Sequence, residues 1–365
     1  MKRLILSLQF VLVSVACTFA QLGGDGYYRI QNVSTGRYVV LIDNVGSIDL
    51  ATSSADLGAI HTLRGYDKVV GNPASVIYVK KVSGSYNLIA QGTDAHEIVG
   101  IYLDIRDMGN NVYRAYKTKG GVTVYLCDED YDTAEGYMMS SGSRTRDWRI
   151  IPITSSSDNY FGITPELSVE GVHYATLYAS FPVKLSSSGL KAYYIRLINE
   201  DVAVYDEITE GEIPASTPVI IQCSSDSYAN NRAEVLSSTS VKVTNNQLKG
   251  VYFDNVKRKN ATPYDASTMR VLGKLSDGSL GFVKASFTNL PANKAYLEVP
   301  EGTPDELHLM SYEKYLEGIH AVAKEGKAGQ AGVYSITGHK LSDNGSADGL
   351  PAGLYLINGK KVAVK

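Results

Sequence analysis

Histidine and cysteine, the side chains that most often carry out catalysis or bind metals, are scattered along this chain of 365 residues. No two histidines form the i, i+4 pair that binds zinc, and the sequence has no nucleophile elbow, phosphate loop or dinucleotide fingerprint. A lone histidine needs a positioned partner before it can act as an acid or base. The histidines are His61, His96, His173, His308, His320 and His339. We therefore predict no catalytic residues, no metal site and no cofactor.

Two cysteines outside the N-terminal segment, Cys127 and Cys223, are too far apart in the sequence to indicate a disulfide scaffold. Neither lies in a recognisable nucleophile motif, and Cys/His spacing typical of a metal site is absent from the sequence. We predict that both are buried and act as small hydrophobic residues.

Carboxylates gather at residues 128–132, Asp-Glu-Asp-Tyr-Asp, where alternating oxygens could bind calcium. This segment lacks the glycine and the terminal glutamate of an EF-hand loop, so we predict a solvated loop. Carboxylate pairs that hydrolyse glycosides are close in space and not in sequence, which leaves that chemistry open. The short β-units described below favour recognition over a large catalytic core. We therefore predict a protein that is not an enzyme.

The elements that must position these side chains are predicted to be β-strands. The chain has 26 tyrosines beside 7 phenylalanines and 1 tryptophan, and tyrosine suits half-buried β-surfaces and binding faces. The 44% hydrophobic content excludes wholesale disorder. A formal charge of −3 with no basic cluster argues against nucleic acid as a partner. We predict an all-β protein.

The first twenty residues indicate export. Lys2 and Arg3 precede a largely apolar run, and small residues end at Ala20, so residues 1–20 are predicted to be a signal peptide cleaved near Ala20. The alternative is lipidation of Cys17. No later stretch is long and apolar enough to form a transmembrane helix. We expect the protein to be secreted or to lie on the outer cell surface.

A weak repeat runs through residues 21–153. Segment 28–38 aligns with 77–86 and, more loosely, with 113–120, which indicates three units of about 40 residues that each open with a hairpin. The Asn-x-Ser-x-Gly-x-Tyr turn at 32–38 and the closing Asp-Trp-Arg-Ile-Ile-Pro at 147–152 resemble a ricin-type β-trefoil domain. The resemblance implies a trefoil over 21–153 with Trp148 packed inside the last repeat.

Sugar-binding β-folds commonly place an aromatic plane under the apolar face of a sugar, with Asp or Asn binding the hydroxyls. Tyr116, Tyr125 and Asp128 in the third repeat form the best local combination of these types, and we predict them as ligand-binding residues. The alternative is that both tyrosines are half-buried sheet residues.

Residues 160–311 are also predicted to be β-rich, as a β-sandwich-like domain. Segment 213–221 (Ile-Pro-Ala-Ser-Thr-Pro-Val-Ile-Ile) is echoed by 290–297 (Leu-Pro-Ala-Asn-Lys-Ala-Tyr-Leu), and proline at such a place marks the start of the strand that follows. We therefore predict that this region was built partly by duplication.

A linker is predicted at 312–331, followed by a short β-module at 332–365. This module contains Leu-Pro-Ala-Gly-Leu-Tyr at 350–355 and a lysine-rich end. Together with the tyrosine strand at 333–335 and its glycine turn, it resembles the last part of the C-terminal sorting domain of the type IX secretion system. The resemblance implies the outer-membrane secretion machinery as a partner, and it leaves open whether the segment is a cleaved export signal.

These features predict a secreted or cell-surface, non-catalytic binding protein that recognises glycan or glycoprotein through its trefoil domain. One alternative is a protein-binding module, such as an adhesin or a protease inhibitor, because trefoils also present protruding loops. Another is an accessory domain protein of a secreted hydrolase.

Overall fold

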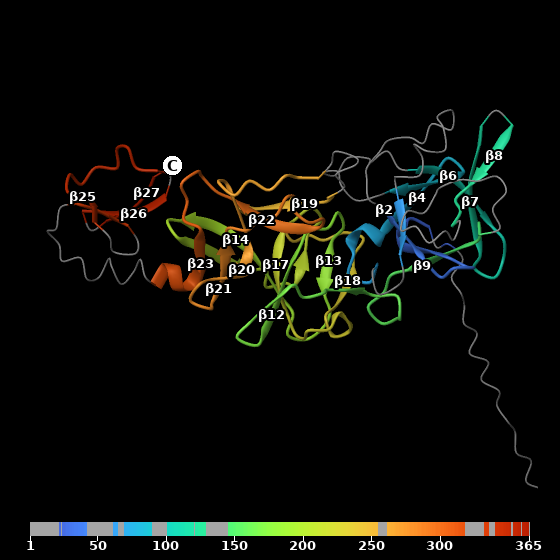
Figure 1. Ribbon diagram of the computed structural model, residues 1–365, viewed down its shortest axis with the longest axis horizontal. Helices are drawn as coiled ribbons and strands as arrows, with labels where there is room; N and C mark the ends of the chain where they lie inside the picture. The colour runs from blue at the N-terminus through green and yellow to red at the C-terminus, as the bar shows by residue number, and fades with distance from the viewer. Residues whose placement is uncertain are drawn as a thin grey trace, which may run out of the picture.

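The computed structural model shows an all-β protein with strands β1 to β27, as the sequence predicts. It describes residues 22, 24–41, 61–64, 69–89, 101–119, 121–128, 145–254, 261–317, 332–335, 340–351, 353–358 and 360–364. The predicted signal peptide lies outside these residues. Within them, no helix is long and apolar enough to cross a membrane. An N-terminal barrel, a central pair of sheets and a C-terminal sheet follow one another along the molecule (Figure 1).

Six antiparallel strands of the N-terminal region pair in a closed ring. Each strand pairs with the next, and the last pairs with the first through five residue pairs that include Ile30 with Ile150. In ring order they are β1 (Gly26–Asn32), β4 (Ile77–Val82), β5 (Ser85–Ile89), β6 (Ile101–Asp107), β7 (Tyr113–Lys119) and β9 (Trp148–Pro152). Closure removes the exposed edges of the sheet and encloses a single core.

Further strands extend two members of the ring. The pair β2 (Tyr38–Leu41) and β3 (His61–Arg64) continues from β1, and β8 (Val122–Tyr125) continues from β7. A six-stranded barrel that carries such extra strands is the architecture predicted for 21–153. The segments repeated in the sequence each cover a strand and the start of the next one: 28–38 covers most of β1 and the first residue of β2, and 77–86 covers β4 and the start of β5. The second strands differ in their place, because β5 belongs to the ring and β2 lies outside it.

Alternate side chains of the ring fill the barrel. Ile30, Ile77, Tyr113 and Trp148 belong to one buried cluster, and Trp148 is only 1% exposed. The indole Nε1 of Trp148 donates a hydrogen bond to the carbonyl of Leu126, at 2.8 Å. This confirms that Trp148 packs inside the last repeat.

Two sheets pack face to face in the central region. The larger one has ten strands, and a smaller sheet of four covers part of it through a shared cluster that includes Phe161, Val183, Leu177 and Ile221. The small sheet contains, in spatial order, β10 (Phe161–Gly162), β18 (Arg232–Val235), β13 (Val183–Leu185) and β16 (Glu212–Ile213). This arrangement is the sandwich-like region that the sequence predicts.

The ten-stranded sheet contains two four-stranded units of the same topology. In each unit the fourth strand in chain order lies between the first and the second. In spatial order the first unit has β12 (Val172–Leu177), β17 (Val219–Cys223), β14 (Lys191–Asn199) and β15 (Val202–Glu207), and the second has β19 (Leu248–Val251), β22 (Lys294–Glu298), β20 (Met269–Lys274) and β21 (Leu280–Val283). Strand β11 (Leu167–Val169) extends the first unit, and β23 (Glu306–Ser311) joins the two.

The echoed Pro-Ala segments lie at equivalent turns of these two units. Ser216 and Asn293 both have positive φ, at 56° and 60°, and each begins the approach to the fourth strand of its unit. The amide of Ser216 donates to Ala179 at 2.8 Å, and the amide of Asn293 donates to Val251 at 2.6 Å. In each unit the acceptor lies at the end of the first strand or just after it. These matching bonds support the predicted duplication.

The barrel is fixed to the central region by Arg29, whose side chain is fully buried. Its guanidinium donates to Ser75 Oγ (3.2 Å), Asn159 Oδ1 (2.9 Å), Tyr160 O (2.7 Å), Val69 O (3.3 Å) and Val70 O (2.9 Å). These acceptors belong to the barrel segment 69–75 and to residues 159–160, which lead into β10. Buried guanidinium groups are tolerated when their donors are satisfied in this way.

The C-terminal sheet has the spatial order β25 (Lys340–Ser342), β24 (Val333–Ser335), β26 (Gly353–Ile357) and β27 (Lys360–Val364). Leu354 packs against a cluster that contains Val202, Val204 and Tyr315. Of the predicted linker, residues 312–317 are helical and Tyr315 is buried, while 318–331 lie outside the described residues.

We expect the protein to lose stability in alkali, because several of its tyrosines are buried. Burial raises the pKa of both Tyr27 and Tyr315 to about 12, and it raises the pKa of Tyr193 further. Above pH ~10 the unfolded chain loses these protons before the folded chain does, so the free energy of unfolding falls as the pH rises toward about 12. Urea midpoints are expected to stay level between about pH 7 and about pH 9 and to fall above about pH 10. A midpoint that stays level up to about pH 11 would contradict this coupling.

Candidate functional site

Asp128, one of the three predicted ligand-binding residues, is fully buried and bound to other side chains. Its carboxylate accepts from the Arg37 guanidinium, with Nε at 3.0 Å from Oδ2, and from the Thr35 hydroxyl. Arg37 and Thr35 belong to the Asn-x-Ser-x-Gly-x-Tyr turn that follows β1. Asp128 therefore joins the first repeat to the third, and its carboxylate is already bound within the protein.

Replacing Asp128 with alanine is expected to destabilise the chain by about 3 kcal/mol, because it leaves the Arg37 guanidinium facing a buried space without its carboxylate. Denaturant unfolding followed by Trp148 fluorescence measures this loss. Arg37→Ala and the double variant complete a mutant cycle, in which we expect a coupling energy of at least about 1 kcal/mol. Strictly additive effects of the two substitutions would contradict the structural role of this pair.

Tyr116 and Tyr125 lie directly opposite each other on β7 and β8. Both rings are half-buried, with centroids 6.0 Å apart and planes tilted by 43°. Tyr113 and Ala115 are buried in the barrel. Successive residues of a strand point to opposite faces, so the side chain of Tyr116 points out of the barrel. The structure therefore brings these two predicted residues together on the outside of the barrel.

An arginine lies over each of these tyrosines. The guanidinium carbon of Arg106, on β6, is 5.2 Å from the Tyr116 centroid, and that of Arg146, just before β9, is 4.7 Å from the Tyr125 centroid. Such cation–π contacts hold a guanidinium parallel to a surface while its N–H edges remain able to bind a partner. Arg106, Tyr116, Tyr125 and Arg146 are called the Arg–Tyr–Tyr–Arg row below.

The polar ends of the row are unoccupied. Within the part of the chain that the structure describes, the two tyrosine hydroxyls make no hydrogen bond, and the two guanidinium groups make neither a hydrogen bond nor an ion pair. The neighbouring Arg114 differs, because its Nε lies 2.5 Å from Asp147 Oδ1 in an ion pair. The row therefore presents two hydroxyls and two cations to a ligand.

The arginines of the row were not predicted from the sequence. Arg106 lies two residues after Asp104 on β6, and residues two apart in a strand point to the same face. The strand pattern could therefore have placed Arg106 on the outer face beside β7. No local signal connects Arg146 to Tyr125, because the contact depends on the closure of the barrel by β9.

The described cysteines lie in the interior of the protein. Cys127 and Cys223 are buried, as predicted, and burial raises the pKa of the Cys223 thiol to about 12. His173 lies opposite Cys223 on β12, but a thiol with so high a pKa is not an activated nucleophile. Among the described residues, no three His, Cys, Asp or Glu side chains gather as a metal site. Residues 129–132 of the acidic segment lie outside the described residues.

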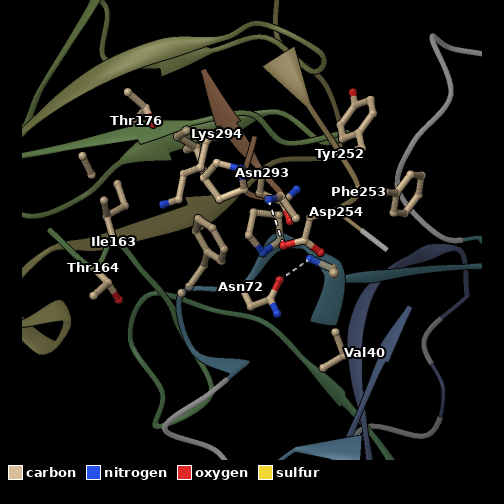
Figure 2. Close-up of a pocket in the computed structure, with 18 residues that line it drawn as sticks. Val40, Asn72, Ile163, Thr164, Thr176, Tyr252, Phe253, Asp254, Asn293 and Lys294 are labelled. Carbon is tan, nitrogen blue, oxygen red and sulfur yellow. Dashed lines mark hydrogen bonds between the residues drawn. The ribbon is translucent and has the colours of Figure 1, made fainter. Parts of the chain in front are cut away.

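A cavity of about 350 Å³ lies where the barrel meets both units of the central sheet (Figure 2). The barrel contributes Val40 and residues 71–74, which include the start of the short helix η1 (Pro73–Ser75). Strand β10 of the small sheet and the residues after it contribute Phe161, Ile163 and Thr164. The first unit of the ten-stranded sheet contributes residues 175–177, and the second contributes 252–254 and 291–294. The volume suits a small ligand, and such sites are common between domains. The sequence gives no signal of this cavity, because the segments that line it are far apart in the sequence and meet only in the fold.

No family model and no curated protein matches this chain. Among solved structures, the chain is similar to a designed three-fold symmetric protein, ThreeFoil, with 18% sequence identity and a TM-score of 0.24. The match covers 35% of this chain and 99% of that chain. The assignment of a function therefore depends on the contacts of this chain itself.

Proposed function

We propose that this chain is a secreted or cell-surface, non-catalytic protein that binds carbohydrate or glycoprotein through the Arg–Tyr–Tyr–Arg row of its N-terminal barrel. The observation that carries the proposal is the row itself. It holds two tyrosine hydroxyls and two guanidinium groups on one outer face, without hydrogen-bond partners in the described part of the chain.

The chemistry of the row favours a sugar that carries a carboxylate or a sulfate. A guanidinium binds a carboxylate through two parallel charge-assisted hydrogen bonds, and its planar geometry suits that group better than an ammonium does. The tyrosine hydroxyls both donate and accept, so they match the hydroxyls of the same sugar. The ring edges supply apolar surface for its C–H groups.

Recognition fits the row better than catalysis does. Hydrolysis of a glycoside generally needs two carboxyl groups on either side of the scissile bond. The row contributes none, and Asp128, the carboxylate that was predicted to bind ligand, binds Arg37 and Thr35 instead. The ligand would therefore be held and released unchanged.

The predicted signal peptide and the sorting-like C-terminal segment support a location outside the cell. Export through the outer-membrane secretion machinery would expose the barrel to glycans outside the cell. Residues 332–365 would then act in export and the barrel in recognition.

A glycan array tests the proposal with the chain that begins after residue 20. We expect binding to oligosaccharides that carry sialic acid, uronic acid or sulfate, and little binding to their neutral counterparts. In the Arg106→Gln/Arg146→Gln variant this preference should be lost, whereas Arg114→Gln should keep it because Arg114 is already paired with Asp147. Absence of binding to every glycan would overturn the proposal. Capture of protein partners that persists after their deglycosylation would favour a protein-binding module instead.

A further inference from the structure

The walls of the junction cavity are held in place by hydrogen bonds from three sides. Asn72 Oδ1 accepts from the amide of Ala74 at 2.9 Å, which caps the helix η1. The amide of Gly162 donates to Val70 at 3.0 Å, so the barrel and the central region are bound backbone to backbone. Asn293 Nδ2 donates to the carbonyl of Tyr178 at 3.0 Å. A cavity with walls fixed in this way needs little ordering when a ligand binds.

Polar groups that retain bonding capacity lie at separate places around the cavity. The Nδ2 of Asn72 and the hydroxyl of Thr164 make no hydrogen bond within the described residues. Asp254 accepts the amide of Ala292 at 3.3 Å through one oxygen, and its other oxygen accepts no hydrogen bond in the part of the chain that the structure describes. Lys294 lies toward Ile163 and Thr164 in Figure 2, whereas Asp254 lies toward Asn72.

The charges of these groups are largely matched inside the protein. Lys294 Nζ is 2.5 Å from Glu166 Oε1, which also accepts the amide of Thr176 at 2.9 Å. Lys294 therefore offers its remaining N–H groups as donors more than it offers a free positive charge. A ligand that carries a strong negative charge would meet Asp254 and a lysine already paired with Glu166, so the chemistry favours a neutral ligand.

Apolar surface separates the polar groups. Val40, Phe161, Leu177 and Phe253 line the cavity, and each of them is less than 9% exposed. A ligand that fits must combine apolar C–H surface with several groups that both donate and accept hydrogen bonds. A hexose ring has this composition, and its size fits a cavity of about 350 Å³.

We propose that the junction cavity is a second ligand site, distinct from the Arg–Tyr–Tyr–Arg row, and that it binds one neutral monosaccharide unit. Asp254 accepts from sugar hydroxyls, while Lys294, Asn72 and Thr164 donate to sugar oxygens. Because the lining comes from both the barrel and the central region, the bound sugar also stabilises the docking of these two regions.

Titration calorimetry tests this site in the chain from which residues 1–20 are removed and in which Tyr116→Ala and Tyr125→Ala silence the row. The probes are glucose, galactose, mannose, fucose and N-acetylglucosamine, with glycine and phenylalanine as zwitterionic comparisons. We expect saturable binding of at least one sugar at millimolar concentration. Asp254→Asn or Lys294→Met should weaken that binding at least about tenfold, because each removes a charge-assisted hydrogen bond.

Matched controls are Asp226→Asn and Lys249→Met, which change residues outside the cavity lining and should leave the affinity unchanged. Circular dichroism identifies any variant that does not fold. If one of the two cavity variants fails to fold, the other still tests the site. The proposal is overturned if no sugar binds, if neither cavity variant binds the sugar more weakly than the parent chain does, or if the amino acids bind in place of the sugars. None of these outcomes bears on the row, since the row is already removed.

Discussion

Replacement of both Tyr116 and Tyr125 by alanine is expected to reduce glycan affinity at least about a hundredfold. Each substitution removes a hydroxyl of the row, and it also removes the ring that holds Arg106 or Arg146 in place. Truncation of a central aromatic contact costs about 2 kcal/mol or more, and two such losses exceed the roughly 2.8 kcal/mol that a hundredfold change in dissociation constant requires. Calorimetric titration with the tightest acidic oligosaccharide from the array measures the effect.

The control for this variant lies on the same two strands. Thr118 and Thr123 pair across β7 and β8, with their hydroxyl oxygens 2.9 Å apart, two residues farther along than the tyrosine pair. The Thr118→Ala/Thr123→Ala variant removes the same number of side chains from the same hairpin, and its glycan affinity should change less than about threefold. Equal losses in the two double variants would contradict the assignment of the site to the row.

Replacement of Arg29 by methionine is expected to destabilise the chain by about 4 kcal/mol. The substitution keeps an apolar side chain of similar length but leaves buried acceptors of the barrel and of residues 159–160 without their donor. An unsatisfied buried polar group costs about 1–3 kcal/mol, and several such groups share the loss here. We also expect the barrel to unfold at a lower denaturant concentration than the central region does.

Two spectroscopic probes distinguish the unfolding of the barrel from that of the central region. Trp148 is the only tryptophan of the chain and lies in the barrel core, so its fluorescence follows the barrel, whereas far-ultraviolet circular dichroism follows all strands. Arg149→Met is the control, because Arg149 is exposed on β9, which pairs with β1. An Arg29→Met variant that unfolds at the denaturant concentration of the Arg149→Met variant would contradict the role of Arg29 at the junction.

The features that were correctly predicted depend on local patterns. Trp148 begins a strand with alternating buried residues, and each of the echoed Pro-Ala turns precedes a strand. Proline and strand alternation act over a few residues, so a single sequence contains their signal. The all-β fold and the duplicated central sheet follow from such signals.

The features that were missed depend on contacts across the chain. Asp128 begins an acidic run that reads as a solvated loop, yet it is buried against Arg37, which lies 91 residues earlier. Asp254 and Asn72 meet at one cavity only because the barrel docks on the central sheet. A sequence pattern indicates which residue types could bind a ligand. Whether such a residue is buried, and which residue it pairs with, depends on the distant segment that packs against it in the fold.

The most direct measurement of the central claim is a calorimetric titration of the chain that lacks residues 1–20 with a matched pair of ligands. One ligand is the tightest acidic oligosaccharide from the array, and the other is the same oligosaccharide with its carboxyl group reduced to an alcohol or its sulfate removed. We expect the acidic form to bind at least about tenfold more tightly, because the two guanidinium groups of the row have no other anionic partner in the described part of the chain. Equal affinity for the two forms, or no binding of either, would contradict it.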